Sequence, residues 1–258
     1  MSRTHFTEKY LLNPYHPVEV NVIGAGGTGC QVLTSLARIS CALRKLGHPG
    51  LHVNVIDGDV VTKANLGRQL FSASEVGLNK AVVLATRINR FFGFDWDAIK
   101  ENYPYDGCTT ANVTITCVDN VKARIEIGKF LRDNVKPKTS RDHDMTKPYY
   151  WLDFGNTADT GQVVLGTICE IEQPKKSKVP SASKLKCVDE MFDLTKVKDE
   201  DSGPSCSLAE ALRKQDLFIN STIAQFGCNI FWKLFSGSIE SQGAFLNLKT
   251  LNTNPINI

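Results

Sequence analysis

Short apolar runs alternate with longer amphipathic segments along the first half of the chain. We predict strands near 20–23, 52–56, 97–102, 112–118, 149–153, 162–169 and 243–249. Helices are predicted near 28–46, 75–91, 121–133, 207–214 and 216–235. Because strands that alternate with helices form a parallel sheet covered on both faces, these elements predict an α/β fold. We expect a doubly wound, mostly parallel, Rossmann-like sheet that the later strands extend in antiparallel fashion.

Length and composition are consistent with a single globular domain. The chain has 258 residues, of which 42% are hydrophobic and 22% charged, so it can bury a substantial core. We predict one domain over 1–258, with a core at 20–170 and C-terminal helices and a strand at 207–258. Between them, residues 171–206 are polar and charged, which predicts a crossover loop that is exposed or mobile.

Net charge and hydropathy indicate which binding partners and which cellular compartment to expect. A net charge of +3 is small and dispersed, so we expect no nucleic-acid partner. No run of about 18 apolar residues is present for a membrane span, and residues 1–15 lack an apolar signal core. Eight cysteines without an evident pairing pattern agree with a reducing compartment. We therefore predict a cytoplasmic protein without a membrane partner.

A glycine loop follows the first predicted strand. It contains Gly24, Gly26, Gly27 and Gly29 in the pattern G-x-G-G-x-G. Such glycines allow a tight turn and let the backbone approach a phosphate chain at a helix N-terminus. The pattern alone is a weak signal, because a tight turn between a strand and a helix needs similar residues.

Residues downstream of the loop favour a nucleoside triphosphate over NAD. Asp57 ends the second strand, where an open α/β sheet places ligand-binding carboxylates, so we expect it to bind the ribose. Arg68 and Lys80 supply the positive charge that a triphosphate requires. Asp119 ends the strand near 112–118 and is a candidate ligand for magnesium. The sequence therefore predicts ATP and Mg²⁺ as cofactors.

The order of these motifs resembles that of the ThiF/MoeB superfamily, the adenylating domain shared with ubiquitin-activating enzymes. The family pattern is G-x-G-G-x-G, then D-x-D-x-V-x-x-x-N-L-x-R-Q, a later Lys, and D-N-x-x-x-R. In this chain these motifs fall at 24–29, 57–69, Lys80, and Asp119-Asn120 with Arg124. Within the superfamily, segments 204–207 and 214–220 look similar to the ThiF-related protein of the bacterial PRTRC cassette.

The resemblance implies an ATP-dependent adenylyltransferase. Such an enzyme activates the C-terminal carboxylate of a small ubiquitin-like (β-grasp) protein as an acyl-adenylate and releases pyrophosphate. Carried over by position, Asp57 would hold the ribose and Asp119 the magnesium, while Asn65, Arg68 and Lys80 would hold the phosphates. The catalytic set is then Arg68, Lys80 and Asp119, and Asp59 and Asn120 complete the nucleotide-binding set.

The resemblance also implies a homodimer and raises the question of a thioester. Dimeric relatives commonly supply an N-terminal arginine to the partner's phosphates, and Arg3 is the sole arginine before the glycine loop. Some relatives pass the activated carboxylate to a thiol, for which Cys187 and Cys206 are candidates because both lie in the polar segment. Cys206 precedes a predicted helix whose N-terminus could lower the pKa of its thiol.

Two other functions remain open at the level of sequence. An NAD-dependent oxidoreductase would use the glycines and Asp57 but would gain nothing from Arg68, Lys80 and Asp119 together. A non-catalytic scaffold would bind ATP without releasing pyrophosphate. The position of Arg3, far from the first strand, keeps this scaffold in consideration.

Overall fold

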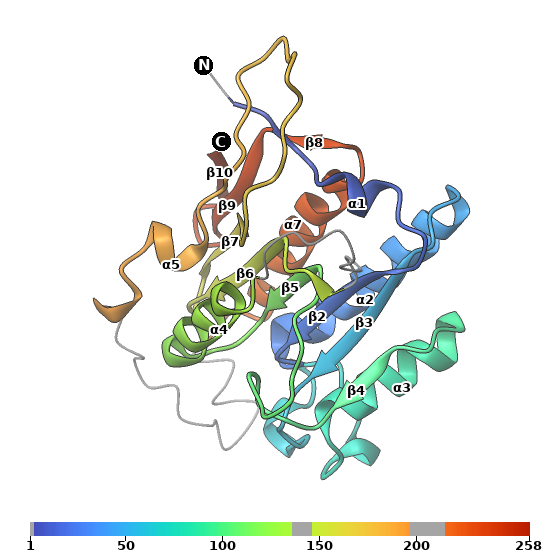
Figure 1. Ribbon diagram of the computed structural model, residues 1–258. Helices are drawn as coiled ribbons and strands as arrows, with labels where there is room; N and C mark the ends of the chain where they lie inside the picture. Colours follow the sequence, from blue (N-terminus) through green and yellow to red (C-terminus); the bar gives the residue numbers. More distant parts are fainter. Residues whose placement is uncertain (1–2, 136–145, 197–214) are drawn as a thin grey trace.

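A mixed eight-stranded sheet forms the centre of the protein in a computed structural model that describes residues 3–135, 146–196 and 215–258 (Figure 1). The strand order is β10-β9-β7-β6-β5-β2-β3-β4. The strands are β2 (Val18–Ile23), β3 (Leu51–Ile56), β4 (Asp97–Ile99), β5 (Val113–Thr116), β6 (Tyr150–Asn156), β7 (Thr160–Thr167), β9 (Ser241–Asn247) and β10 (Asn252–Asn257). A separate antiparallel pair joins β1 (His5–Phe6) to β8 (Ser238–Ile239).

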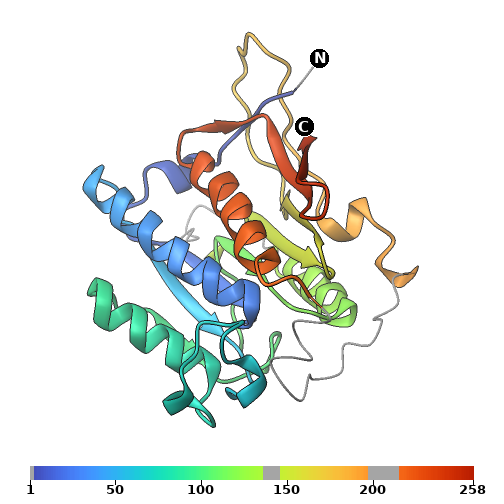
Figure 2. The same cartoon turned by 180° about the vertical axis from the view of Figure 1, so that it is seen from behind.

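Helices cover both faces of the sheet. One face carries α2, α3 and α7, which lie in front of the strands in Figure 2, and the other carries α4 with α5 packed beside it. The helices are α1 (Lys9–Leu12), α2 (Gly27–Lys45), α3 (Lys80–Phe92), α4 (Val121–Asp133), α5 (Val188–Met191) and α7 (Ile219–Leu234). The 3-10 turns are η1 (Lys63–Asn65), η2 (Ala73–Glu75) and η4 (Leu194–Lys196).

The sheet changes direction at β6. Strand β2 pairs in parallel with β3 and β5, and β5 pairs in parallel with β6. From there β6, β7, β9 and β10 pair in antiparallel fashion. The predicted Rossmann-like α/β fold with an antiparallel extension is therefore confirmed.

Packing of α7 against the antiparallel half of the sheet depends on the glycine at position 227. At Gly227, an added Cβ would lie 2.8 Å from a methyl of Val163 and closer still to the ring of Phe154. The helix can therefore approach β6 and β7 closely, and Phe154 and Phe231 are fully buried. This contact holds the middle of α7 against β6 and β7.

Several predicted boundaries differ from the structure. The helix expected from 75 begins at Lys80, because Asn79 caps it with a hydrogen bond from Val82 N to its Oδ1 (3.1 Å). Strand β10 was not predicted, since Asn252–Asn257 is polar and contains a proline. The helix predicted over 207–214 lies outside the described residues.

The crossover segment was expected to be exposed or mobile, and in its described part, 171–196, exposure is wrong for several apolar positions. Charged residues on the surface alternate with anchors that are almost fully buried, namely Ile171, Leu185, Cys187 and Val188. Cys187 and Val188 belong to the core that also contains Ile127 and Trp151. Ile171 and Leu185 belong to the larger core around β2. The segment is rich in charged residues, so its few isolated apolar positions did not predict burial. No helix in the described ranges is long and apolar enough to cross a membrane.

Candidate functional site

The glycine loop connects β2 to α2 at the carboxyl end of the parallel strands. Gly24 has a φ of +91°, and an added Cβ there would lie 2.8 Å from the carbonyl oxygen of Cys117, so only glycine fits without strain. Gly26 is the N-cap of α2, and Gly27 and Gly29 lie in its first turn. The loop thus directs the N-terminus of a 19-residue helix toward this edge of the sheet, where an anion is favoured.

Asp57 follows β3 and holds the glycine loop in place. Its carboxylate accepts hydrogen bonds from Ala25 N (2.6 Å) and Asp59 N (2.8 Å). Burial raises the pKa of Asp57, while these two backbone donors and nearby Lys80 oppose that shift. Each carboxylate oxygen retains a further lone pair, so the group can also accept a ligand hydroxyl.

Lys80 begins α3 and turns back toward the strand ends. Its Nζ lies 2.8 Å from the Asp59 carboxylate, and the lysine side chain is 10% exposed while that of Asp59 is 71% exposed. Asn79 secures this turn, because its Nδ2 donates to the carbonyl oxygens of Asp57 (2.8 Å) and Asp59 (3.0 Å). The ammonium group is therefore held at the edge by one exposed carboxylate, at the end of a turn that the Asn79 amide fixes.

Arg68 lies on the loop between β3 and α3 and lacks a full set of partners. Its NH1 donates to Gln215 Oε1 at 2.8 Å, whereas its buried Nε and the buried Oε1 of Gln69 have no hydrogen-bond partner in the described structure. Burial lowers the pKa of Arg68, and Cys30 and Asp119 oppose that shift. The guanidinium is thus partly desolvated, and it forms no ion pair with a carboxylate among the described residues.

Other residues of the predicted set make local contacts. Asn65 Oδ1 accepts from Thr62 N at 2.8 Å and closes the turn η1. Asn120 Oδ1 accepts from Ala123 N at 2.8 Å and caps α4. Asp119 directly precedes that N-cap and is exposed. Its negative charge opposes the lowering of the Arg68 pKa by burial. The structure therefore brings the glycine loop, Asp57, Lys80, Arg68 and Asp119 to one edge of the sheet.

A second arginine, Arg124, is paired with a buried carboxylate. Its Nε donates to both carboxylate oxygens of Asp153 (3.1 and 3.2 Å). Its NH2 donates to the carbonyl oxygens of Val118 (2.6 Å) and Phe154 (2.8 Å). Asp153 is 1% exposed and also accepts from Thr116 Oγ1 at 2.5 Å. This ion pair anchors α4 to β5 and β6 and belongs to the core.

The structure describes one of the two candidate thiols, Cys187. Cys206 lies outside the described residues. Cys187 is 1% exposed, and burial, followed by the charges of Glu190 and Asp189, raises the pKa of its thiol. The exposed setting expected for Cys187 is therefore wrong, because its side chain packs beside Gly166 of β7. Cys187 forms no disulfide within the described part of the chain.

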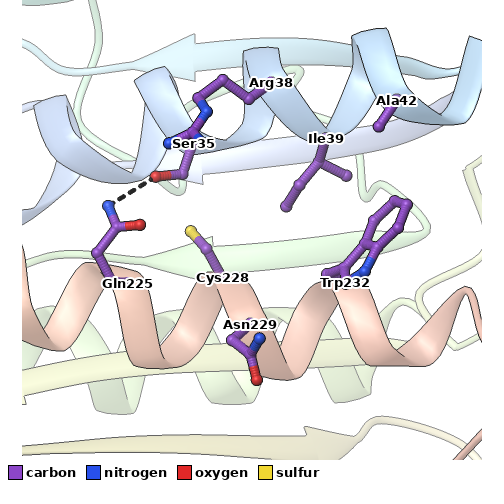
Figure 3. Close-up of a pocket in the computed structure, with 8 residues that line it drawn as sticks. All are labelled: Ser35, Arg38, Ile39, Ala42, Gln225, Cys228, Asn229 and Trp232. Carbon is purple, nitrogen blue, oxygen red and sulfur yellow. Dashed lines mark hydrogen bonds between the residues drawn. The ribbon is translucent and has the colours of Figure 1, made fainter.

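A groove of about 310 Å³ separates the middle parts of α2 and α7 (Figure 3). Gln225 bridges it by donating to Ser35 Oγ at 3.0 Å. The groove begins two turns along α2 from the glycine loop, so it is distinct from the sheet edge described above. Its lining residues are Ser35, Arg38, Ile39, Ala42, Gln225, Cys228, Asn229 and Trp232.

Three polar residues of the edge were missed at the level of sequence. Asn79 was detectable as a helix N-cap directly before Lys80. Gln215 and Asn220 were noted within a motif but were given no role, and their contacts with Arg68 and Thr28 cross more than 140 positions of sequence. No local pattern reports such long-range hydrogen bonds.

The sheet order, the glycine loop and the helices on both faces define an α/β protein of the Rossmann-like class. More narrowly, the chain belongs to the ThiF family, whose model matches residues 12–254. The expected superfamily is thereby confirmed at the level of the family. The narrower resemblance to the PRTRC cassette protein stays a prediction.

Curated relatives include subunits of activating enzymes for ubiquitin-like proteins. Over 149 residues, 56% of this chain, it is 32% identical to the NEDD8-activating enzyme E1 catalytic subunit of Dictyostelium discoideum. Over 126 residues it is 31% identical to the SUMO-activating enzyme subunit uba-2 of Caenorhabditis elegans. The matches span 32% and 20% of the relatives' lengths. Each match therefore covers less than a third of the relative's length.

Solved structures share the fold. Escherichia coli MccB with ATP superposes with a TM-score of 0.57 at 16% identity, covering 93% of this chain and 63% of MccB. PaaA gives a TM-score of 0.59, also at 16% identity, with 93% and 64% covered. At this identity the likeness shows the fold. MccB itself has been solved with ATP and with MccA.

Proposed function

We propose that the protein is an ATP-dependent adenylyltransferase that activates the C-terminal carboxylate of a small ubiquitin-like protein. The observation that carries this proposal is the partly buried guanidinium of Arg68 beside the glycine loop, with no carboxylate in contact within the described ranges. Burying a cation without an anion is costly, so such a site favours an anionic ligand. Family membership and the relatives that activate NEDD8 and SUMO add support.

The edge has the charges that a triphosphate needs. The N-terminus of α2, Arg68 and Lys80 supply positive charge, and the Asp57 carboxylate can accept a ribose hydroxyl. Asp119 is exposed at the same edge and offers the carboxylate oxygens that Mg²⁺ prefers. Bound there, Mg²⁺ would neutralise phosphate charge.

The proposed reaction depends on orientation and charge neutralisation. The carboxylate oxygen of the partner's tail attacks the α-phosphorus of ATP, and the bond to the bridging oxygen breaks, so that pyrophosphate leaves. A carboxylate is already deprotonated, so this step requires no general base. Arg68 and Lys80 would hold the phosphates in line and offset the negative charge that concentrates where two anions meet.

Exchange of labelled pyrophosphate into ATP tests the proposal. Purified protein with Mg²⁺ is assayed alone and with each small β-grasp protein encoded in the same genome. We expect exchange that depends on one of these proteins and is lost in Asp119→Ala. ATP binding without exchange for any candidate would instead identify a nucleotide-binding scaffold. A fluorescence change on binding NADH, with no binding of ATP, would identify an oxidoreductase.

The homodimer expected from the family belongs to this proposal. Arg3 N donates to the carbonyl oxygen of Ile258 at 3.0 Å, which places the start of the described chain beside its C-terminal residue. We propose that any contribution of Arg3 to phosphate binding comes from a second copy. Sedimentation velocity measures the oligomeric state, and loss of ATP affinity in Arg3→Ala would support a role for this side chain.

A further inference from the structure

Gln215, which precedes α7, contacts the guanidinium of Arg68. The 2.8 Å bond from Arg68 NH1 to Gln215 Oε1 is the hydrogen bond that the described structure gives this arginine. The acceptor is a neutral amide, so it orients the guanidinium without neutralising its charge. A carboxylate at the same position would form an ion pair and compete with an anionic ligand.

Asn220 extends this contact to the glycine loop. Gln215 Oε1 also accepts from Asn220 Nδ2 at 3.0 Å, and Asn220 Oδ1 accepts from Thr28 Oγ1 at 2.9 Å. Asn220 is 5% exposed, and a Cβ at Gly27 would approach its Nδ2 to 2.8 Å. Hydrogen bonds therefore run continuously from Arg68 through Gln215 and Asn220 to the first turn of α2.

The turn between β6 and β7 supports the same two side chains. Gln215 Nε2 donates to the carbonyl oxygen of Thr157 at 3.4 Å, and Asn156 Nδ2 lies 3.5 Å from Asn220 Oδ1. Both amides are thus oriented from two sides. The N-terminal end of α7, far along the chain from both phosphate-binding motifs, sets their relative geometry.

We propose that Gln215 and Asn220 are positioning residues that hold Arg68 and the glycine loop in register for one phosphate chain. This inference rests on the proposed function, because it assumes that the anion at the site is that of ATP. A neutral amide is required at position 215, since it must fix the arginine while leaving its charge available to the phosphate. The segment that leads into α7 therefore takes part in nucleotide affinity.

The variant Gln215→Glu separates charge from packing. It keeps the size of the side chain and an acceptor oxygen but places a carboxylate beside Arg68. We expect ATP affinity, measured by calorimetry, to fall about tenfold to a hundredfold, as for the loss of one charge-assisted contact. The variant loses the long donation from Nε2 to Thr157 O (3.4 Å), but the new ion pair with Arg68 offsets this loss. Thermal stability without ligand should therefore be unchanged or higher, which a purely structural role for Gln215 does not predict. Gln225→Glu makes the same chemical change in α7 at the groove and should bind ATP like the wild type.

A double variant tests whether Gln215 acts through Arg68. If it does, Arg68→Ala with Gln215→Glu should bind ATP no more weakly than Arg68→Ala alone. Wild-type affinity in Gln215→Glu, or a loss that adds fully to that of Arg68→Ala, would overturn the inference. If the wild type binds ATP but shows no exchange with any β-grasp protein, the proposed function is overturned. The coupling between Gln215 and Arg68 can then still be measured from ATP affinity. Wild-type protein that binds no ATP would overturn both.

Discussion

Arg124 and Arg68 are two partly buried arginines with opposite environments. Arg124 binds both oxygens of the buried Asp153 carboxylate and two backbone carbonyls. Arg68 meets the neutral amide of Gln215, and its buried Nε has no partner in the described structure. The fold pairs the first charge with a buried carboxylate and gives the second no carboxylate partner among the described residues. The difference indicates that Arg124 stabilises the fold and that Arg68 is available to a ligand.

The largest expected change in stability comes from breaking the ion pair between Arg124 and Asp153. Arg124→Ala leaves the Asp153 carboxylate buried without a cation, which should lower the free energy of unfolding by about 3–5 kcal/mol. Urea denaturation followed by circular dichroism measures this change. Lys129→Ala removes an exposed cation of α4 that has no ion pair among the described residues, and it serves as a control with a smaller loss. A loss below 1 kcal/mol in Arg124→Ala would show that the ion pair is not structural.

Cys187 extends the comparison to a buried thiol. Burial raises the pKa of this thiol, so its thiolate is scarce at neutral pH. We expect Cys187→Ser to keep full exchange activity and to lose about 1 kcal/mol of stability, because a hydroxyl replaces sulfur in an apolar site. Exchange assays and denaturation curves give the two values. Accumulation of a thioester on Cys187 of the wild type, cleaved by an added thiol through acyl transfer, would contradict this account.

Removing Arg68 should change stability less than removing Arg124 does. Without ligand, Arg68→Ala should alter the free energy of unfolding by less than about 1 kcal/mol, since the lost hydrogen bond is offset by relief from desolvation. The same denaturation experiment measures it. A loss as large as that of Arg124→Ala would mean that both arginines serve the fold.

The smallest effect concerns pH and Asp57. Burial raises the pKa of Asp57 in the folded state, so folding favours its protonated form, and this stabilisation is lost as pH rises through the folded pKa. Asp57→Asn does not titrate. The stability of the wild type relative to Asp57→Asn should therefore fall between the ordinary pKa of 3.8 and the raised value and stay constant above it. A relative stability that rises over this range would contradict the assigned direction.

The edge of the sheet was largely predictable from sequence because its residues follow strands. Asp57 and Asp119 come after apolar runs whose carboxyl ends must meet, and the glycine loop directly precedes a long helix. Strand β10 and the buried anchors near Cys187 were not predictable, since tertiary contacts outweigh their polar local sequence. The contact of Gln215 with Arg68 joins positions 147 apart and leaves no local pattern.

Calorimetric titration of ATP into wild-type protein and Arg68→Ala tests the central claim most directly. The account predicts measurable binding by the wild type and an affinity lower by about tenfold to a hundredfold in Arg68→Ala, with both proteins equally folded. Arg90→Ala removes an exposed arginine of α3 and should bind ATP like the wild type. Equal ATP affinity in Arg68→Ala and the wild type would contradict the claim that Arg68 is held ready for a phosphate.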